Sequence, residues 1–179
     1  MRIIGGKLRH RLIEEVHLPT TRETQDKVRQ AIFNMIGPYF DGGTVLDLFA
    51  GSGALAIEAY SRGMSFLYFN DKESQAIQTV KKNCCKLNIT DFRCFTLDYN
   101  DFFRQQLPLF DLIFLDPPYR LFDTTNLLEK VYPHTSKDAV IVVELAKESA
   151  YPLSYCEFYL EKDKTYGIKR ILIYRRHRP

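Results

Sequence analysis

Residues 45–56, Val-Leu-Asp-Leu-Phe-Ala-Gly-Ser-Gly-Ala-Leu-Ala, decide the fold. The apolar residues 44–49 predict a short buried strand, and Gly51-Ser52-Gly53 predicts a tight turn into a helix that ends near Arg62-Gly63. The same alternation of strand and helix continues along the chain. It predicts strands over 66–70, 92–97, 110–115 and 139–145, with helices over 73–87, 99–106 and 123–132 between them.

This alternation is typical of an α/β fold with a mostly parallel sheet and helices on both faces. Residues 155–161 and 168–175 predict two further strands with no helix between them. Such a pair would form an antiparallel edge of the sheet and bring it to seven strands.

The residues ahead of the sheet predict a small extension. Residues 1–12 predict a hairpin, and Thr24 is expected to cap a helix that runs to Ile36. We therefore expect one domain, in which residues 1–40 form an N-terminal hairpin and helix extension and residues 41–179 form a Rossmann-like core.

The composition is that of an ordinary soluble globular protein, with 45% hydrophobic and 26% charged residues among 179. No apolar run approaches the ~20 residues that a membrane span needs, and we expect no secretory signal in the first residues. The four cysteines form no C-x-x-C pair, so we expect reduced thiols, no metal and a cytoplasmic location. We also expect a monomer.

The net charge of +3 hides an uneven distribution. Residues 1–11 and 168–179 hold 9 of the 25 basic residues and none of the 22 acidic ones, so the middle of the chain has a net charge of −6. Basic ends favour a polyanionic partner that is bound through salt-dependent phosphate contacts. The alternative is that both ends are merely solvated. The candidates for phosphate contacts are Arg2, Lys7, Arg9, Arg175 and Arg176.

Four acidic residues stand at or just after the ends of predicted strands: Asp47, Asp71, Asp98 and Asp116. Because ligands of open parallel sheets bind beyond the carboxyl ends of the strands, we expect these carboxylates to line one crevice. Residues 51–56 with Asp71 match a dinucleotide fingerprint, which leaves open an NAD-dependent oxidoreductase. However, Asp47 would repel a pyrophosphate, whereas it would attract the ammonium and sulfonium groups of S-adenosylmethionine.

A second motif, Asp116-Pro117-Pro118-Tyr119, ends the apolar strand over 110–115. Neither proline has a backbone N–H to donate, so the chain must leave the sheet here. It leaves with a carboxylate, free carbonyl groups and an aromatic ring at the mouth of the strand. These groups suit a flat base that carries an amine.

Three blocks of the sequence resemble the RsmD family of bacterial 16S ribosomal RNA guanine-N2 methyltransferases. They are residues 21–34, residues 45–59 and Asp116-Pro117-Pro118-Tyr119. The resemblance covers nearly the whole chain and departs at Glu23, where the family usually has proline, and at Ala56, where glycine is common. It implies a class I S-adenosylmethionine-dependent methyltransferase fold and, as substrate, one loop guanine of 16S rRNA in the small ribosomal subunit.

The candidate catalytic residues are those of the proline motif. We expect the Asp116 side chain and the Pro117 carbonyl to accept the hydrogens of the target amine, so that its lone pair faces the methyl group. Tyr119 would stack on the base, and Pro118 would contact it. The resemblance also places Arg22 and Thr24 where they would close the site from the N-terminal side.

The candidate cofactor residues surround the glycine turn. Gly51 and Gly53 would allow a close approach of the backbone, and Asp71 would bind the ribose hydroxyls. Asp47 would serve the methionine end. Asp98 with Tyr99 beside it would bind the adenine amine, although Asp98 would serve equally well as the N-cap of the helix that follows.

Two further functions remain open. An adenine-N6 methyltransferase on DNA or RNA is one, because D-P-P-Y also serves that chemistry. A non-catalytic RNA-binding assembly factor that has kept the fold is the other, although the intact residues 116–119 argue against it.

Overall fold

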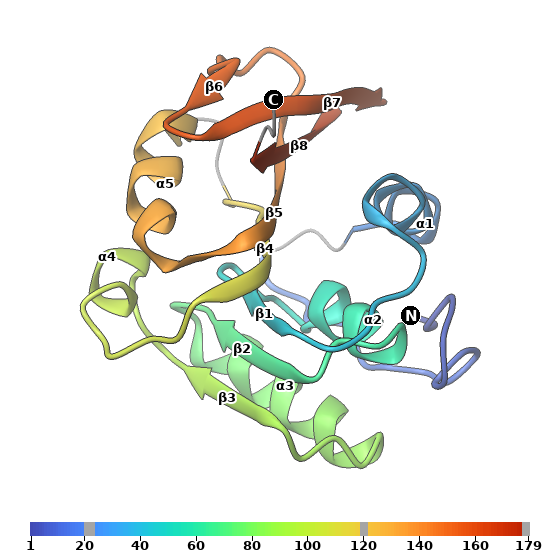
Figure 1. The fold of residues 1–179 in the computed structure, drawn as a ribbon. Helices are drawn as coiled ribbons and strands as arrows, with labels where there is room; N and C mark the ends of the chain where they lie inside the picture. Colours follow the sequence, from blue (N-terminus) through green and yellow to red (C-terminus); the bar gives the residue numbers. More distant parts are fainter. Residues whose placement is uncertain (20–23, 119–121, 177–179) are drawn as a thin grey trace.

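The computed structural model describes residues 1–19, 24–118 and 122–176 (Figure 1). One sheet runs through it in the order β3-β2-β1-β4-β5-β8-β7-β6. The first five strands in this order are parallel, and β8, β7 and β6 extend the sheet antiparallel. The strands are β1 (Thr44–Asp47), β2 (Phe66–Asn70), β3 (Phe92–Phe95), β4 (Phe110–Leu115), β5 (Thr135–Ala146), β6 (Ser154–Tyr155), β7 (Phe158–Tyr166) and β8 (Lys169–Arg176).

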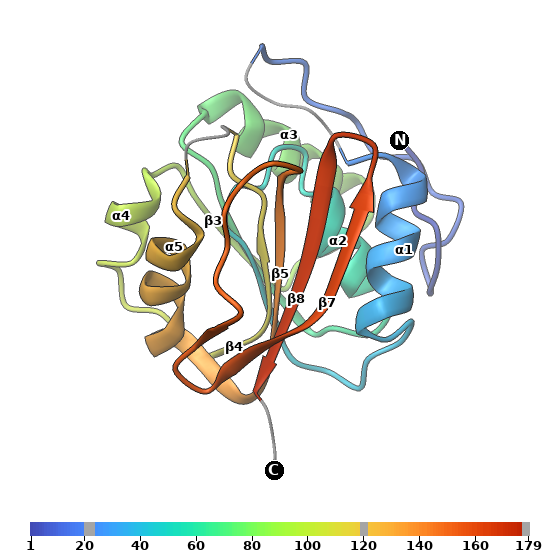
Figure 2. The ribbon, with the colours of Figure 1, turned by 90° about the horizontal axis from the view of Figure 1, so that it is seen from above.

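Helices cover both faces of this sheet (Figure 2). The helices α1 (Asp26–Ile36), α2 (Ala54–Ser61) and α3 (Ser74–Lys86) lie on one face. On the other lie α4 (Tyr99–Phe102) and α5 (Thr124–Val131), which continues into η1 (Tyr132–His134). Successive strand residues face opposite layers: Val45 packs with the first group and Leu46 with the second. The predicted α/β class with an antiparallel edge is confirmed.

Several predicted elements have different bounds. The sheet has eight strands instead of seven, because the two-residue β6 pairs with the start of β7. The strand predicted over 139–145 begins at Thr135, and the helix predicted over 99–106 ends at Phe102. Local patterns set where these elements lie, while pairing with neighbouring strands decides how far they extend.

The first residues fold back on themselves as a small hairpin does. Arg2 and Leu12 form an antiparallel bridge, and the amides of Ile3 and Ile13 donate to the carbonyls of Arg11 and Met1 at 2.9 Å each. The expectation for Thr24 was wrong. Thr24 does not cap α1, which begins at Asp26 with no side-chain cap on Gln25. The Thr24 hydroxyl instead donates to a side chain of β5.

The turn between β1 and α2 needs both of its glycines. Gly51 has a φ of +56° and Gly53 a φ of +83°, in the left-handed region that disfavours residues with a Cβ atom. A Cβ atom on Gly53 would also lie only 2.9 Å from the ring of Phe69. The turn therefore brings the backbone close to β2, as the fingerprint predicts.

The N-terminal residues are held on α2 by one buried carboxylate, that of Glu58, which has no exposed surface. Its Oε1 atom accepts hydrogen bonds from the amide of Gly5 at 2.9 Å and from Nε of Arg62 at 2.9 Å. Its Oε2 atom accepts from the amide of Ile4 at 3.0 Å and lies 3.7 Å from Nη1 of Arg29. Glu58 thus joins three segments: the first residues, α1 and the end of α2.

We expect Glu58→Ala to lower the free energy of unfolding by about 3–5 kcal/mol, because it would remove the carboxylate partner of the buried Arg62 guanidinium and one of the two carboxylates beside the buried Arg29. Urea denaturation followed by circular dichroism measures this change. Asp101→Ala is the matched control, since it removes an exposed partner of Arg104 and should cost at most about 1 kcal/mol. Equal losses in the two variants would contradict the structural role of Glu58.

Candidate functional site

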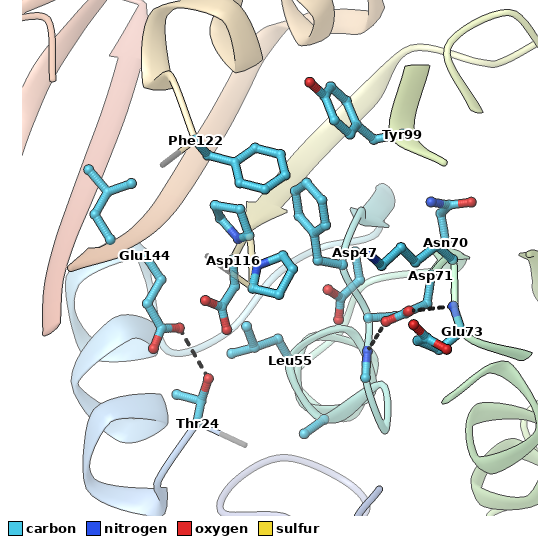
Figure 3. Close-up of a pocket in the computed structure, with 18 of the residues that line it drawn as sticks. Thr24, Asp47, Leu55, Asn70, Asp71, Glu73, Tyr99, Asp116, Phe122 and Glu144 are labelled. Atoms are coloured by element: carbon cyan, nitrogen blue, oxygen red, sulfur yellow. Dashed lines mark hydrogen bonds between the residues drawn. The ribbon is translucent and has the colours of Figure 1, made fainter. Parts of the chain in front are cut away.

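A cavity of about 290 Å³ lies at the carboxyl ends of the parallel strands (Figure 3). It is bounded by the ends of β1, β2, β4 and β5 and by the start of β8. Nearly all the described residues that we predicted for the catalytic and cofactor sites line it. They are Asp47, Gly51, Asp71, Asp98, Tyr99, Asp116, Pro117 and Pro118, joined by Thr24. The expected convergence of strand ends thus holds for these residues.

Asp71 is the acid most firmly placed by backbone groups. Its Oδ2 atom accepts from the amide of Gly51 at 3.0 Å, and its Oδ1 atom accepts from the amide of Glu73 at 2.9 Å (Figure 3). Burial raises the pKa of Asp71, and the two amide hydrogen bonds oppose that rise. Each carboxylate oxygen keeps a free lone pair on the cavity side for a hydroxyl donor.

Asp47 and Asn70 lie deep at the ends of β1 and β2. Asp47 is only 2% exposed, and its Oδ2 atom accepts a hydrogen bond of 3.3 Å from the amide of Ala56 in α2. The amide group of Asn70 donates to the carbonyls of Leu48 and Leu97. Its buried Oδ1 atom has no hydrogen-bond partner, so the cavity offers an acceptor that a bound ligand could satisfy.

One wall of the cavity is aromatic. The rings of Phe49, Tyr99 and Phe122 form a cluster with centroid distances of 5.5–5.9 Å. Asp98 stands beside this cluster and caps α4, since its Oδ1 atom accepts from the amide of Asn100 at 2.9 Å. The N-cap role of Asp98 is therefore observed, and it leaves the second carboxylate oxygen available at the cavity.

The opposite wall holds a pair of carboxyl groups. Asp116 lies beside Glu144 of β5, which is 3% exposed. Glu144 also accepts from the Thr24 hydroxyl at 3.1 Å and forms an ion pair with the ammonium group of Lys169. Burial raises the pKa of Asp116 well above its usual range, and the charge of Glu144 raises it further. Figure 3 shows the Asp116 carboxyl between those of Glu144 and Asp47.

The predicted phosphate contacts do not gather at this cavity. Lys7 lies near the last turn of α2, with its Nζ atom 3.9 Å from the centroid of the Tyr60 ring, and Arg9 lines an open groove at the same end. Arg2 is exposed in the same N-terminal segment. Arg175 pairs with Val140 near the middle of β5, and Arg176 contacts Thr135 at the amino end of that strand, so the end of β8 is also remote from the cavity.

Arg175 and Arg176 already have partners within the chain. Nε of Arg175 lies 2.6 Å from a carboxylate oxygen of Glu161, and Nε of Arg176 lies 3.2 Å from one of Glu157. Arg22 and Tyr119, the other two predicted site residues, lie outside the described residues.

Sequence reasoning missed several residues of the cavity, among them Phe49, Asn70, Phe122, Glu144 and Lys169. Glu144 could have been found, because it is a lone acid in the apolar run Val-Ile-Val-Val-Glu-Leu of residues 140–145. Such a charge is seldom buried without a partner or a function. The aromatic residues carried no comparable signal, since rings also fill the core elsewhere.

Within the described ranges, no helix is long and apolar enough to span a membrane. Those same residues contain no group of three or more His, Cys, Asp or Glu side chains placed to hold a metal ion.

The comparisons with known proteins identify the family. The family model described as "Conserved hypothetical protein 95" matches residues 1–175. The chain is 41% identical to "Putative rRNA methyltransferase YlbH" of Bacillus subtilis, over 98% of this chain and 99% of that protein. It is 32% identical to ribosomal RNA small subunit methyltransferase D of Escherichia coli, over 98% of this chain and 90% of that protein.

A solved structure, "Putative methyltransferase yhhF from Escherichia coli", has a TM-score of 0.87 and 27% identity, and the match covers 100% of this chain and 99% of that one. The structures that share the fold include "A putative sam-dependent methyltransferase from Streptococcus mutans", with a TM-score of 0.70 at 15% identity over 87% of this chain and 50% of that one. The chain thus belongs to the RsmD family of methyltransferases, the family of "Conserved hypothetical protein 95".

Proposed function

We propose that the protein transfers the methyl group of S-adenosylmethionine to the exocyclic N2 amine of a loop guanine in 16S rRNA of the small ribosomal subunit, in the cytoplasm of a bacterium. The observation that supports this most is that Asp116, Pro117 and Pro118 line the same cavity as the acids at the ends of β1 and β2. Two relatives are named as rRNA methyltransferases, one of them for the small subunit.

The residues of the cavity fit the cofactor. Four acids and the unpartnered Oδ1 atom of Asn70 offer acceptors for a ligand rich in amino and hydroxyl groups. We assign the ribose hydroxyls to Asp71, the adenine to Asp98, Tyr99 and the adjoining rings, and the methionine end to Asp47. Gly51 and Gly53 set the turn that gives the ligand room at the backbone.

When bound, the cofactor supplies a methyl group on a cationic sulfur, which needs no further activation. The chain must instead orient a weak nucleophile, because the guanine amine shares its lone pair with the ring. We assign this task to Asp116 and to the Pro117 carbonyl, which accept the two amine hydrogens and leave the lone pair free. Alignment and electrostatics of this kind supply most of the rate in such a site.

Two sets of contacts would hold the RNA. Tyr119 follows the two prolines in sequence, and we propose that it stacks on the extruded base, an interaction worth ~1–3 kcal/mol on aromatic platforms. Arg22 would close the site beside Thr24. A base from a loop is already partly unstacked, so its extrusion costs less than extrusion from a duplex.

The phosphates would be held at a distance from the cavity. Lys7 and Arg9 border an open groove together with Tyr39, whose side chain is 70% exposed. We propose that this groove, with Arg2 nearby, contacts RNA phosphates. Arg175 and Arg176 would add to the positive field, although each is also paired with a glutamate.

Methyl transfer to small subunits and to naked 16S rRNA, followed by nucleoside analysis, tests the proposed function. We expect radiolabel from S-adenosylmethionine in N2-methylguanosine. Radiolabel in N6-methyladenosine would overturn the guanine assignment, and no incorporation into either substrate would favour an assembly factor. Comparison of the two substrates also shows whether the subunit surface is needed.

Asp116→Ala should reduce methyl transfer by at least about 100-fold, because it removes one of the two acceptors that orient the amine. The affinity for S-adenosylhomocysteine, measured by calorimetry, should change little. The exposed Asp101→Ala variant serves as the control for both measurements. Turnover near that of the unmodified protein would refute the orienting role.

Asp71→Ala should weaken S-adenosylmethionine binding by about 10- to 100-fold, since a charge-assisted hydrogen bond contributes roughly 1.5–3 kcal/mol. Titration calorimetry gives the affinity, and a thermal melt shows whether the turn at Gly51 persists without its carboxylate. If the folded variant binds as tightly as the unmodified protein, the ribose assignment is wrong.

A further inference from the structure

The geometry around Asp116 is set by two strands. In the register of β4 with β5, Leu115 lies beside Val143, so the next residues along, Asp116 and Glu144, are neighbours. Both oxygens of Glu144 are occupied: Oε1 by the ammonium of Lys169 and Oε2 by the hydroxyl of Thr24. Glu144 is therefore a fixed carboxylate with a compensating cation.

The closeness of the Asp116 and Glu144 carboxyl groups has a chemical consequence. Two carboxylates that share one buried site repel each other, so the pair favours the state in which one of them carries a proton. The ammonium of Lys169 is paired with the Glu144 carboxylate, so we place the proton on Asp116. This agrees with the pKa of Asp116, which burial and Glu144 raise and Lys169 lowers only in part.

The other charged groups at the cavity do not offset this arrangement. Asp47 faces Asp116 from β1, and its charge also favours the protonated form. Across the cavity lie Lys72 and the acids at the ends of β2 and β3: Asp71, Glu73 and Asp98. Thr24, at the start of the α1 segment, is uncharged. Among the described lining residues, acids outnumber lysines by six to two.

We propose that Glu144 is a positioning residue for Asp116. Together with Lys169 and Thr24, it keeps one proton on the Asp116–Glu144 pair while the cavity holds no cation. The pair releases this proton when the cationic methyl donor binds. The proton passes to solvent, and Asp116 becomes the ionised acceptor that the amine requires. This inference rests on the cofactor and on the placement of Asp116, and does not depend on which base is methylated.

The pair would also balance the reaction. As the bond between the amine nitrogen and the methyl carbon forms, the sulfur–carbon bond breaks and its electron pair stays on sulfur. Asp116 receives the proton that the nitrogen loses, so the pair again carries one proton beside a neutral thioether. The pair therefore distinguishes the methyl donor from the product, which has lost the sulfonium charge, and this favours release of the product.

Calorimetry tests this in buffers of different ionisation enthalpy, with S-adenosylmethionine and S-adenosylhomocysteine as matched ligands that differ by the methyl group and its charge. We expect binding of the methyl donor to release up to about one proton, and binding of the product to release less. At pH values at which the free protein still holds the proton on the pair, the affinity for S-adenosylmethionine should rise up to about tenfold per pH unit. The affinity for S-adenosylhomocysteine should stay nearly level. Equal proton release by the two ligands would overturn the proposal.

Two variants separate this role from a structural one. Glu144→Gln removes the neighbouring negative charge, so Asp116 should ionise more readily and the pH of half-maximal proton release should fall. Lys169→Met removes the compensating positive charge, so that pH should rise. If Glu144 and Lys169 merely held β5 to β8, the two substitutions would not shift the pH of half-maximal proton release in opposite directions.

The exposed Asp101→Asn variant is the matched control and should leave proton release unchanged. If either variant fails to fold, the comparison of the two ligands on the unmodified protein still decides the matter. Shifts of the same sign in both variants would overturn the role of Glu144. If the nucleoside analysis finds the radiolabel in N6-methyladenosine, the guanine assignment is wrong, but this proposal still stands.

Discussion

The parallel pairing of β1 with β2 and β4, and of β4 with β5, is the constraint on which the rest depends. It forces the carboxyl ends of these strands to one edge of the sheet, and with them Asp47, Asp71, Asp116 and Glu144. Like charges in a partly dry cavity repel one another and resist ionisation. A cation relieves that repulsion. The fold itself therefore creates the preference for a positively charged ligand.

Two buried glutamates show how surroundings decide the role of one side chain. Glu58 is completely enclosed, and amide and guanidinium donors satisfy both of its oxygens. It ties the first residues to α2 and stands clear of the cavity. Glu144, at the edge of the cavity, accepts from Thr24 and Lys169 and has a second carboxyl group beside it. The first arrangement stabilises a contact between segments, whereas the second leaves a proton to be moved.

The separation between the cavity and the basic groove has a consequence for the substrate. α2 has its amino end at the glycine turn and its carboxyl end beside Lys7, and eight residues of helix span about 12 Å. A single nucleotide could not reach both places. The proposed substrate must therefore be an extended or folded RNA whose backbone follows the flank of the protein while one base enters the cavity.

The sequence by itself determined the fold class, the glycine turn and the acids at the strand ends, because these follow from local periodicity and from residues close together along the chain. Tertiary structure alone decided the environment of Asp116. Thr24 and Glu144 are 120 residues apart, and Lys169 reaches Glu144 only because β8 runs antiparallel to β5. The same reversal carries Arg175 away from the cavity. Because β8 runs antiparallel to β5, its first residue, Lys169, reaches the site, whereas Arg175 and Arg176 at its other end do not. No local pattern of charge encodes this difference.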